Sequence, residues 1–401
     1  AITLQFSQYD SGHGHPMVVK EYEQGYDWMH QGEGYFFFYL LGPADPLNGA
    51  NRARACRYAG FYLNEDPEVY NYDPALRLVT SPHPGSMGPG WRNFGGPEGK
   101  PWGPADWKQY YGLPFQDVPG VRTLEDIQDP AKAAAMGKAI RERMARGDVA
   151  TNLAITSLVT QAYLYTGDDK YKRWVGEYVE AWLERAKRNN GILPDNVGLS
   201  GRIGEYTGGK WYGGYYGWTW PHGWHTLGAA VTAAAENAAL LYRDPSYLDL
   251  ARSQMEMLMQ GGIEREGTLY VPYKYGDAGW YGYTYGRGVL RQEGPGPEET
   301  RPILWRDGWF EFQPMEARCP AHVWLISGSD ADRRRMVALR NQGARDWQQV
   351  LDLHTKDQGG HEQAWLAYLQ GEYPTYPEEI LKHNLMQVYR RLYFIYRDQQ
   401  D

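Results

Sequence analysis

Pairs of amphipathic helices joined by short turns recur along this chain, and they limit the folds it can adopt. In residues 152–165 apolar side chains fall at i, i+3, i+4 and i+7, the turn TGDDK follows, and a second amphipathic helix is predicted over 171–187. The same plan predicts helix pairs at 225–242 with 247–259, 320–326 with 331–345, 361–369 with 380–397, and 34–41 with 51–62. Pairs spaced by roughly 40 to 75 residues are typical of stacked αα-hairpins.

The predicted fold is therefore an all-α (α/α) toroid, closed or incomplete, with about six to seven helical hairpins in a single domain over residues 1–401. A solenoid of hairpins has a similar pattern, but its repeats are more regular in length. Residues 81–120 and 270–308 lack helical periodicity and are rich in Gly, Pro and aromatic residues, which is typical of lids or binding walls. We expect residues 1–120 to form an N-terminal wall or lid around a cleft.

Composition argues against several classes of function. The formal charge of −8 gives no electrostatic reason to expect nucleic acid, and no apolar run reaches the ~18 residues of a membrane span. HExxH, CxxC and EF-hand patterns are missing, and the pair His13 and His15 lacks a third ligand, so we expect neither a metal nor a cofactor. Cys56 and Cys319 are predicted to be buried thiols rather than a bridge.

The first residues of the chain give a prediction of where in or outside the cell the protein acts. It begins at Ala1, with neither a Met nor a basic and apolar leader. A mature product after signal-peptide removal has this form, and a recombinant chain can share it. We expect a secreted or periplasmic protein that does not associate with a membrane.

Residues 193–227 bring aromatic rings beside groups that can move a proton. This segment contains four Trp, four Tyr and two His, together with Asn196, Arg202 and Lys210. Aromatic faces with a few convergent polar groups are what a sugar-binding cleft needs, and 15% of the whole chain is aromatic. The alternative is a Gly-rich loop whose rings only cover the end of a helix.

A second aromatic cluster, VPYKYGDAGWYGYTYGRG, spans residues 271–288. Tyr281 and Tyr283 lie 56 and 58 residues after His225, which is about one hairpin further round a toroid and lets a Tyr face a His from the previous rim loop. β-Elimination of a uronic acid needs a group that neutralises the carboxylate, a base and an acid, and Tyr, His and nearby cations can supply them. The carboxylate is neutralised, a base removes the C5 proton, and an acid protonates the departing glycosidic oxygen.

The residues of both clusters can be assigned to these steps. Tyr281 or Tyr283 is predicted to be the acid, or both acid and base, and His225 or His222 the base or proton partner. The predicted neutralisers of the carboxylate are Asn196, Lys274, Arg287 and, as an alternative amide, Asn152. The predicted sugar contacts are Trp218, Trp220, Tyr215, Trp280, Arg202 and Lys210. Each residue type also has an ordinary use, because His and Asn occupy helix ends and turns and Tyr packs in cores.

Two other functions compete with elimination. The carboxylates in the same loops could form a glycoside hydrolase if two of them lay ~5 to 9 Å apart. These candidates are Asp195, Glu205, Asp277, Asp307 and Glu311. Hydrolysis ranks second because the His, Tyr and basic residues cluster more tightly than any two acids. A non-catalytic sugar-binding toroid ranks third, since it leaves the His residues without a role.

With these hairpins and the motifs WPHGWH and KYGDAGWYGY, residues 148–401 resemble the helical-toroid polysaccharide lyases, which include alginate, glucuronan and hyaluronan lyases and heparinase-like enzymes. The chain looks most like polysaccharide lyase family thirty-eight. The resemblance implies cleavage of glucuronan or alginate by a Tyr/His apparatus, with an acidic polysaccharide or oligosaccharide as the partner. It matches His225 to the family's His and Tyr281 to its Tyr, whereas Lys274 departs from the Arg of related lyases.

Overall fold

The computed structural model describes residues 39, 42–82, 85, 112–115, 117–277, 290–293, 309–340 and 367–398. These residues are mostly helical. Their contacts divide the chain, which the sequence predicted as a single domain, into two compact units. The first contains Ala1–Gly262 and Tyr270–Gln313, and the second contains Ile263–Leu269 and Pro314–Asp401.

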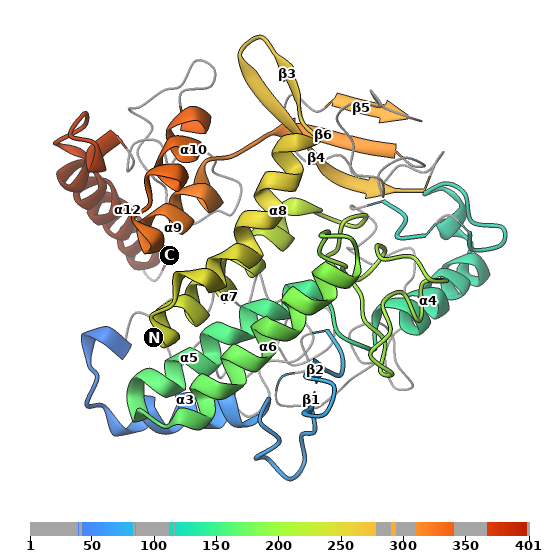
Figure 1. The fold of residues 1–401 in the computed structure, drawn as a ribbon, viewed down its shortest axis with the longest axis horizontal. Coiled ribbons are helices and arrows are strands. Elements are labelled where there is room, and N and C mark those ends of the chain that lie inside the picture. Colours follow the sequence, from blue (N-terminus) through green and yellow to red (C-terminus); the bar gives the residue numbers. More distant parts are fainter. Residues whose placement is uncertain are drawn as a thin grey trace. The chain divides into compact units, whose positions relative to one another are not determined.

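Three helices form the centre of the first unit. They are α5 (Ile155–Thr166), α6 (Asp169–Arg188) and α7 (Trp224–Tyr242), and they pack against one another (Figure 1). Helix α3 (Gly49–Gly60) packs on α5, whereas η6 (Pro245–Leu248) and α8 (Asp249–Gln260) pack on α7. The predicted pairs 152–165 with 171–187 and 225–242 with 247–259 are confirmed to within a few residues at each end. Of the pair 34–41 with 51–62, the second helix is confirmed as α3, and the first lies outside the described residues except for Tyr39.

The turn between α5 and α6 follows from its sequence. Gly167 ends α5 with a φ of 68°, a left-handed conformation that glycine adopts without strain. Asp168 then caps α6, because its side chain accepts a hydrogen bond from the backbone nitrogen of Lys170 at 3.0 Å. The two helices can therefore reverse direction within two residues.

Helix α6 buries a ladder of large side chains along one face. Trp174 stacks on Tyr178 with ring centroids 4.9 Å apart, and Tyr178 meets the edge of Trp182 at 6.5 Å. The guanidinium of Arg185 lies 4.6 Å from the centre of the Trp182 ring and completes the ladder. The spacing of three and four residues is that of a helix face, so a charged group is carried into the core with the rings.

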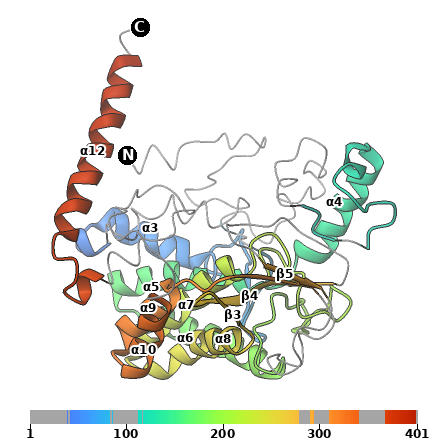
Figure 2. The same cartoon turned by 90° about the horizontal axis from the view of Figure 1, so that it is seen from above.

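A second hydrophobic cluster lies beneath α4 (Pro130–Met144), which stands at the opposite end of this unit from α3 (Figures 1 and 2). The short helices η4 (Asp126–Gln128) and η5 (Ala150–Ala154) flank α4 in the chain. The apolar face of α4 packs with residues 113–127 and with the rings of Tyr215, Tyr216 and Trp220. The aromatic segment 193–227, called the aromatic loop from here on, thus contributes rings to the hydrophobic core beneath α4.

The described residues also form strands, which an all-α fold does not contain. Strand β1 (Tyr72–Asp73) pairs with β2 (Leu78–Val79), and a four-stranded sheet has the order β3 (Ile263–Arg265), β4 (Thr268–Gly276), β6 (Trp309–Pro314) and β5 (Leu290–Glu293). In the antiparallel pair β5–β6, Leu290 lies opposite Phe312. Residues 270–276 were predicted as part of a loop, but their Tyr and Val side chains suit a strand and lack helical periodicity.

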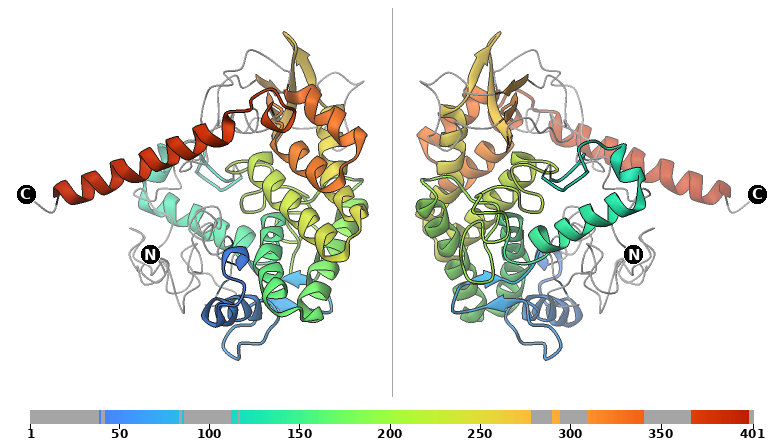
Figure 3. Two further views of the ribbon diagram at one scale, coloured as in Figure 1. Left: turned by 90° about the vertical axis from the view of Figure 1, so that its left-hand side faces the viewer. Right: turned by 90° about the vertical axis from the view of Figure 1, so that its right-hand side faces the viewer.

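In the second unit, α9 (Arg318–Ser327) and α10 (Asp330–Arg340) form a predicted hairpin, and α12 (Tyr376–Asp398) is one unbroken helix (Figure 3). Asp332 accepts hydrogen bonds from the hydroxyl groups of Ser327 and Ser329 at 2.6 and 2.9 Å, which fixes the hairpin turn. Among the helices described, none is long and apolar enough to cross a bilayer.

A buried carboxylate, Asp148, joins the parts of the first unit. Its oxygens accept hydrogen bonds from Asn152 at 3.0 Å, from the Tyr178 hydroxyl at 2.9 Å and from the Arg185 guanidinium at 3.0 Å. Its backbone pairs in both directions with Val197, at 2.7 and 2.8 Å. Asp148 and Arg185 are 1% and 2% exposed, so this ion pair is shielded from water.

We expect Arg185→Met to destabilise the first unit by about 3–5 kcal/mol, because it leaves the charge of Asp148 buried without its cation. Urea unfolding followed by tryptophan fluorescence measures the loss. Arg188→Met, at an exposed position of the same helix, is the matched control and should change the free energy of unfolding by less than about 0.5 kcal/mol. Equal stabilities of the two variants would contradict this role.

Candidate active site

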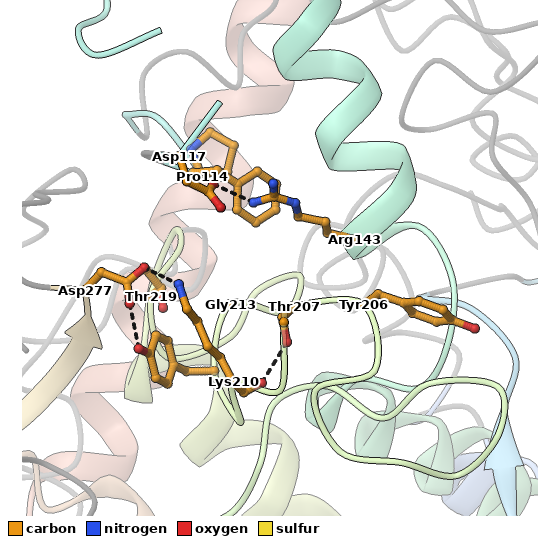
Figure 4. Close-up of a pocket in the computed structure, with 12 residues that line it drawn as sticks. Pro114, Asp117, Arg143, Tyr206, Thr207, Lys210, Gly213, Thr219 and Asp277 are labelled. Carbon is orange, nitrogen blue, oxygen red and sulfur yellow. Dashed lines mark hydrogen bonds and ion pairs between the residues drawn. The ribbon is translucent and has the colours of Figure 1, made fainter. Parts of the chain in front are cut away.

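A pocket of about 280 Å³ opens in the first unit between the loop before α4 and the aromatic loop (Figure 4). Its volume is close to the lower limit of about 300 Å³ that is usual for small-molecule sites. The lining residues are Pro114, Phe115, Asp117, Arg143, Tyr206, Thr207, Gly208, Lys210, Tyr212, Gly213, Thr219 and Asp277. Rings, cations and carboxylates therefore meet in one concave site.

Asp277, at the end of β4, is the acceptor for two groups of the aromatic loop. The Lys210 ammonium lies 2.6 Å from one carboxylate oxygen, and the Tyr212 hydroxyl donates to the other at 2.7 Å (Figure 4). Burial first, and then the hydrogen bond to Asp277, raise the pKa of Tyr212 far above its usual value, so its hydroxyl keeps its proton. The side chains of Lys210 and Asp277 are 41% and 45% exposed, so a ligand can reach this pair.

A second ion pair lies on another side of the pocket. The Arg143 guanidinium, from the last turn of α4, lies 2.6 Å from Asp117 and 4.6 Å from the centre of the Phe115 ring (Figure 4). Partial burial acts to raise the pKa of Asp117, but the hydrogen bond and charge of Arg143 outweigh it and hold this pKa below its usual range. Asp117 is therefore held ionised.

Tyr206 and Thr219 offer the pocket an aromatic face and a hydroxyl group for contacts with a ligand. The ring of Tyr206 lines it and has the Arg146 guanidinium 4.0 Å from its centre. The hydroxyl of Thr219 is buried and has no hydrogen-bond partner in the described structure. Because a buried hydroxyl without a partner costs free energy, a polar ligand that supplied one would be favoured.

Asp195 holds the loop that carries Lys210 and Tyr212. Its carboxylate accepts hydrogen bonds from the backbone nitrogens of Gly213, Gly214 and Trp218 at 3.1, 2.8 and 2.7 Å. A Cβ at Gly217 would fall 2.0 Å from the same carboxylate, so glycine is required there for the close approach of the chain. Burial raises the pKa of Asp195 to about 6, against the opposing effect of these hydrogen bonds.

The predicted neutralisers Asn196 and Asn152 are built into this framework. Asn196 donates to Asp195 at 2.9 Å and to the backbone oxygen of Lys210 at 3.2 Å, and it accepts from Thr207. Asn152 is fully buried and donates to Asp148 and to the backbone oxygen of Ser81. Both amides position the chain around the pocket, and neither lines it.

The rings predicted as sugar platforms are core residues in this structure. Trp218, Trp220 and Tyr215 are 0, 1 and 2% exposed, and the Trp218 and Trp220 indole nitrogens donate to backbone oxygens. They are buried because α4 and the neighbouring rings cover them. The rings that line the pocket are instead Phe115, Tyr206 and Tyr212.

The predicted candidates His222, His225 and Lys274 lie outside the pocket lining. His222 is buried and His225, in the first turn of α7, is half-buried, with their ring centroids 6.3 Å apart. Lys274 is fully buried, and its ammonium lies 4.0 Å from Glu311. In this conformation Lys274 has no access to a polymer in solution.

The remaining predicted residues divide into those that line the pocket, those that lie away from it and those outside the described part of the chain. Lys210 does line the pocket, whereas Arg202 is 75% exposed and lies 3.8 Å from Glu205. Trp280, Tyr281, Tyr283 and Arg287 lie outside the described residues, as do His13, His15 and Asp307. Across the parts of the chain that are described, no cluster of three or more metal-ligating side chains was found. Cys56 and Cys319 are thiols, the first partly exposed and the second buried.

Sequence reasoning missed the other wall of the pocket. Phe115, Asp117 and Arg143 come from residues 112–144, where no recognisable motif marks them. Arg143 could only have been noticed as a cation in the last turn of a helix, where cations are common for electrostatic reasons. The fold, not a local pattern, brings it to the aromatic loop.

The chain is thus a mostly helical protein with a pocket lined by aromatic rings and two ion pairs. Its whole length, residues 1–401, matches the family model described as a domain of unknown function (DUF8034), and the chain belongs to that family. No curated protein and no solved structure matches it.

We expect the stability of the first unit to carry a pH dependence from Asp195. Because its folded-state pKa of about 6 exceeds the unfolded value of ~3.9, its contribution is complete below about pH 4 and is lost as the pH rises through about 6. The shift of about two units corresponds to about 3 kcal/mol. Urea unfolding at the two ends of this range should therefore show a smaller loss of stability for Asp195→Asn than for the wild type.

A control variant tests the sign of this effect. A backbone hydrogen bond from Ser246 lowers the pKa of the exposed Asp244, so Asp244→Asn should remove a contribution that is present at higher pH and lost as the pH falls. If Asp195→Asn and the wild type lost stability equally between about pH 4 and pH 7.5, the raised pKa of Asp195 would be refuted.

Proposed function

We propose that the protein is a polysaccharide lyase that cleaves a uronic-acid-containing polysaccharide of the glucuronan or alginate type by β-elimination. The observation that supports this most is the carboxylate of Asp277, held by the Lys210 ammonium and the Tyr212 hydroxyl in a ring-lined pocket. A cation and a hydroxyl donor around one carboxylate are what a bound uronate needs. The carboxylate of a bound uronate would accept hydrogen bonds from Lys210 and Tyr212, either together with Asp277 or in its place.

In the proposed reaction the neutralised carboxylate makes the C5 proton acidic. A base removes that proton, its electron pair forms the C4–C5 double bond, the C4–O bond breaks, and an acid protonates the departing oxygen. The proposed proton donors remain Tyr281 and Tyr283, which follow Asp277 by four and six residues in the sequence, with His225 or His222 as base or proton partner. Lys210 joins them as the proposed neutraliser of the carboxylate.

The hairpins α5–α6 and α9–α10 support an (α/α) toroid with aromatic rim loops, which is our proposal for the complete fold. We further propose that the protein is secreted or periplasmic, where an acidic polysaccharide is accessible as substrate. The pocket is open to solvent at Lys210 and Asp277, which suits a chain-like ligand.

Hydrolysis is the second candidate, because Asp117 and Asp277 line the same pocket. A glycoside hydrolase needs one carboxyl that keeps its proton and one that does not. The lowered pKa of Asp117 suits a base or nucleophile, not the acid. The raised pKa of Asp195 would suit an acid, but this carboxyl is fully buried and engaged by the backbone of the aromatic loop.

The nature of the products separates the two reactions. With glucuronan, alginate and hyaluronan as substrates, we expect the wild type to release unsaturated uronates, which absorb in the ultraviolet, because elimination leaves a C4–C5 double bond. A neutral glucan is the control substrate and should not be cleaved. New reducing ends without that absorbance would reject the lyase and favour hydrolysis.

Removing the cation of the pocket tests its role in binding. We expect Lys210→Met to lower kcat/KM for the polyuronate by about 10- to 100-fold, as the loss of a charge-assisted hydrogen bond predicts, with the folded structure unchanged. Lys187→Met, at an exposed position in the last turn of α6, is the matched control. Kinetics equal to those of the control would remove Lys210 and this pocket from the site.

A further inference from the structure

Arg146 is a half-buried cation beside the pocket that has no carboxylate partner. Its guanidinium lies 4.0 Å from the centre of the Tyr206 ring, and its Nε donates a hydrogen bond to the backbone oxygen of Glu142 at 3.0 Å. Among the described residues, no carboxylate lies within ion-pair distance of this guanidinium, and its two terminal nitrogens have no hydrogen-bond partner. The pocket cations Arg143 and Lys210 are instead each paired with a carboxylate at 2.6 Å.

The backbone on both sides of this stack is held in place. Gly147, which follows the arginine, donates a hydrogen bond from its nitrogen to the backbone oxygen of Thr80 at 2.8 Å. A Cβ at Gly147 would fall 2.4 Å from the backbone oxygen of Val197, so glycine is required for this close approach. The Tyr206 hydroxyl accepts a hydrogen bond from the backbone nitrogen of Leu199 at 3.3 Å. Because both partners of the stack are fixed in the free protein, a ligand loses little affinity in ordering them.

The stack lies at the end of the pocket away from Asp277. Tyr206 lines that end (Figure 4), whereas Arg146 is not part of the lining. The pocket volume of about 280 Å³ is near the lower limit for small-molecule sites, so the pocket encloses only a short part of a polymer. The next part of a bound chain that left the pocket past Tyr206 would therefore meet Arg146.

The chemistry of the free donors indicates what they bind. A guanidinium over an aromatic face keeps its N–H edge available, and that edge matches the two oxygens of a carboxylate. A carboxylate at Lys210 must compete with Asp277, but at Arg146 no protein carboxylate has to be displaced. Arg146 can therefore contribute the whole of a charge-assisted contact to binding.

We propose that Arg146 binds the carboxylate of a second uronate, next in the chain to the uronate held at Lys210 and Tyr212. The inference rests on the proposed function, because it takes a uronate at Lys210 as the first contact. It goes further in naming the substrate class: the site selects polymers in which consecutive units are acidic. A polymer that alternates uronates with neutral sugars places a neutral unit beside Arg146 and gains no contact there.

Calorimetric titration with two tetrasaccharides tests the proposal. Every unit of a glucuronan tetrasaccharide is acidic, whereas only every second unit of a hyaluronan tetrasaccharide is. We expect Arg146→Met to weaken binding of the first by about 10-fold and of the second by less than about 2-fold, because only the first places a carboxylate at Arg146. Arg141→Met, at another half-buried cation near the end of α4, is the matched control and should change neither affinity by more than about 2-fold.

The selectivity of the loss separates binding from a structural role. Equal losses for both tetrasaccharides would mean that Arg146 only supports Tyr206 or attracts anions in general, and would overturn the proposal. Affinities of Arg146→Met equal to those of the control, or a wild type that binds neither ligand, would do the same. Arg146→Lys keeps the charge without the planar edge, so it should recover part of the affinity for the glucuronan tetrasaccharide.

The ultraviolet absorbance of the same samples reports elimination separately. A selective loss of affinity without unsaturated products would keep the second uronate contact and reject the lyase. Unsaturated products, together with an Arg146→Met variant that binds like the control, would reject the second contact alone.

Discussion

The buried ion pair of Asp148 and Arg185 is the interaction on which the first unit depends. It is the meeting point of α6, of η5 through Asn152, of β2 through the backbone nitrogen of Val79, and of the aromatic loop through Val197. Burial raises the pKa of Asp148, and the Arg185 charge opposes that rise. Such a pair adds little net stability over apolar packing, but removing one partner leaves a buried charge and is strongly destabilising. An arrangement of α6, η5, β2 and the aromatic loop that separated the two charges would therefore be unfavourable.

The framework continues from Val197 to the pocket. Asp195, two residues earlier, is the acceptor for three backbone nitrogens of the aromatic loop, and Asn196 between them binds the backbone oxygen of Lys210. A Gly-rich loop would otherwise be expected to be mobile. Because these polar groups satisfy its backbone, the loop can hold Lys210 and Tyr212 at fixed distances from Asp277 without a regular secondary structure.

The sequence predicts the helices of this chain better than its site. Apolar periodicity located α5, α6, α7 and α12 to within a few residues, because a helix face repeats locally. It could not separate rings that pack from rings that bind, since Trp218 and Tyr206 lie in the same loop and only α4 and the neighbouring rings decide which is covered. Arg143 and Asp117 were missed because only the tertiary fold brings them to the same pocket as the loop.

The protonation states of the pocket bear on the chemistry it can support. Its two cations, Arg143 and Lys210, are each balanced by a carboxylate, so a charged ligand gains little from long-range attraction and must instead compete for the same donors. Selection then depends on geometry, because only a group that reproduces the acceptor positions of Asp277 recovers the contacts to Lys210 and Tyr212. A planar carboxylate attached to a sugar ring meets that requirement, whereas a neutral hydroxyl leaves the Lys210 ammonium with a poorer acceptor. The same balance holds Asp117 ionised and leaves Tyr212 with its proton, so Tyr212 can donate a hydrogen bond to a bound carboxylate, and Asp117 is unsuited to act as a carboxylic acid catalyst.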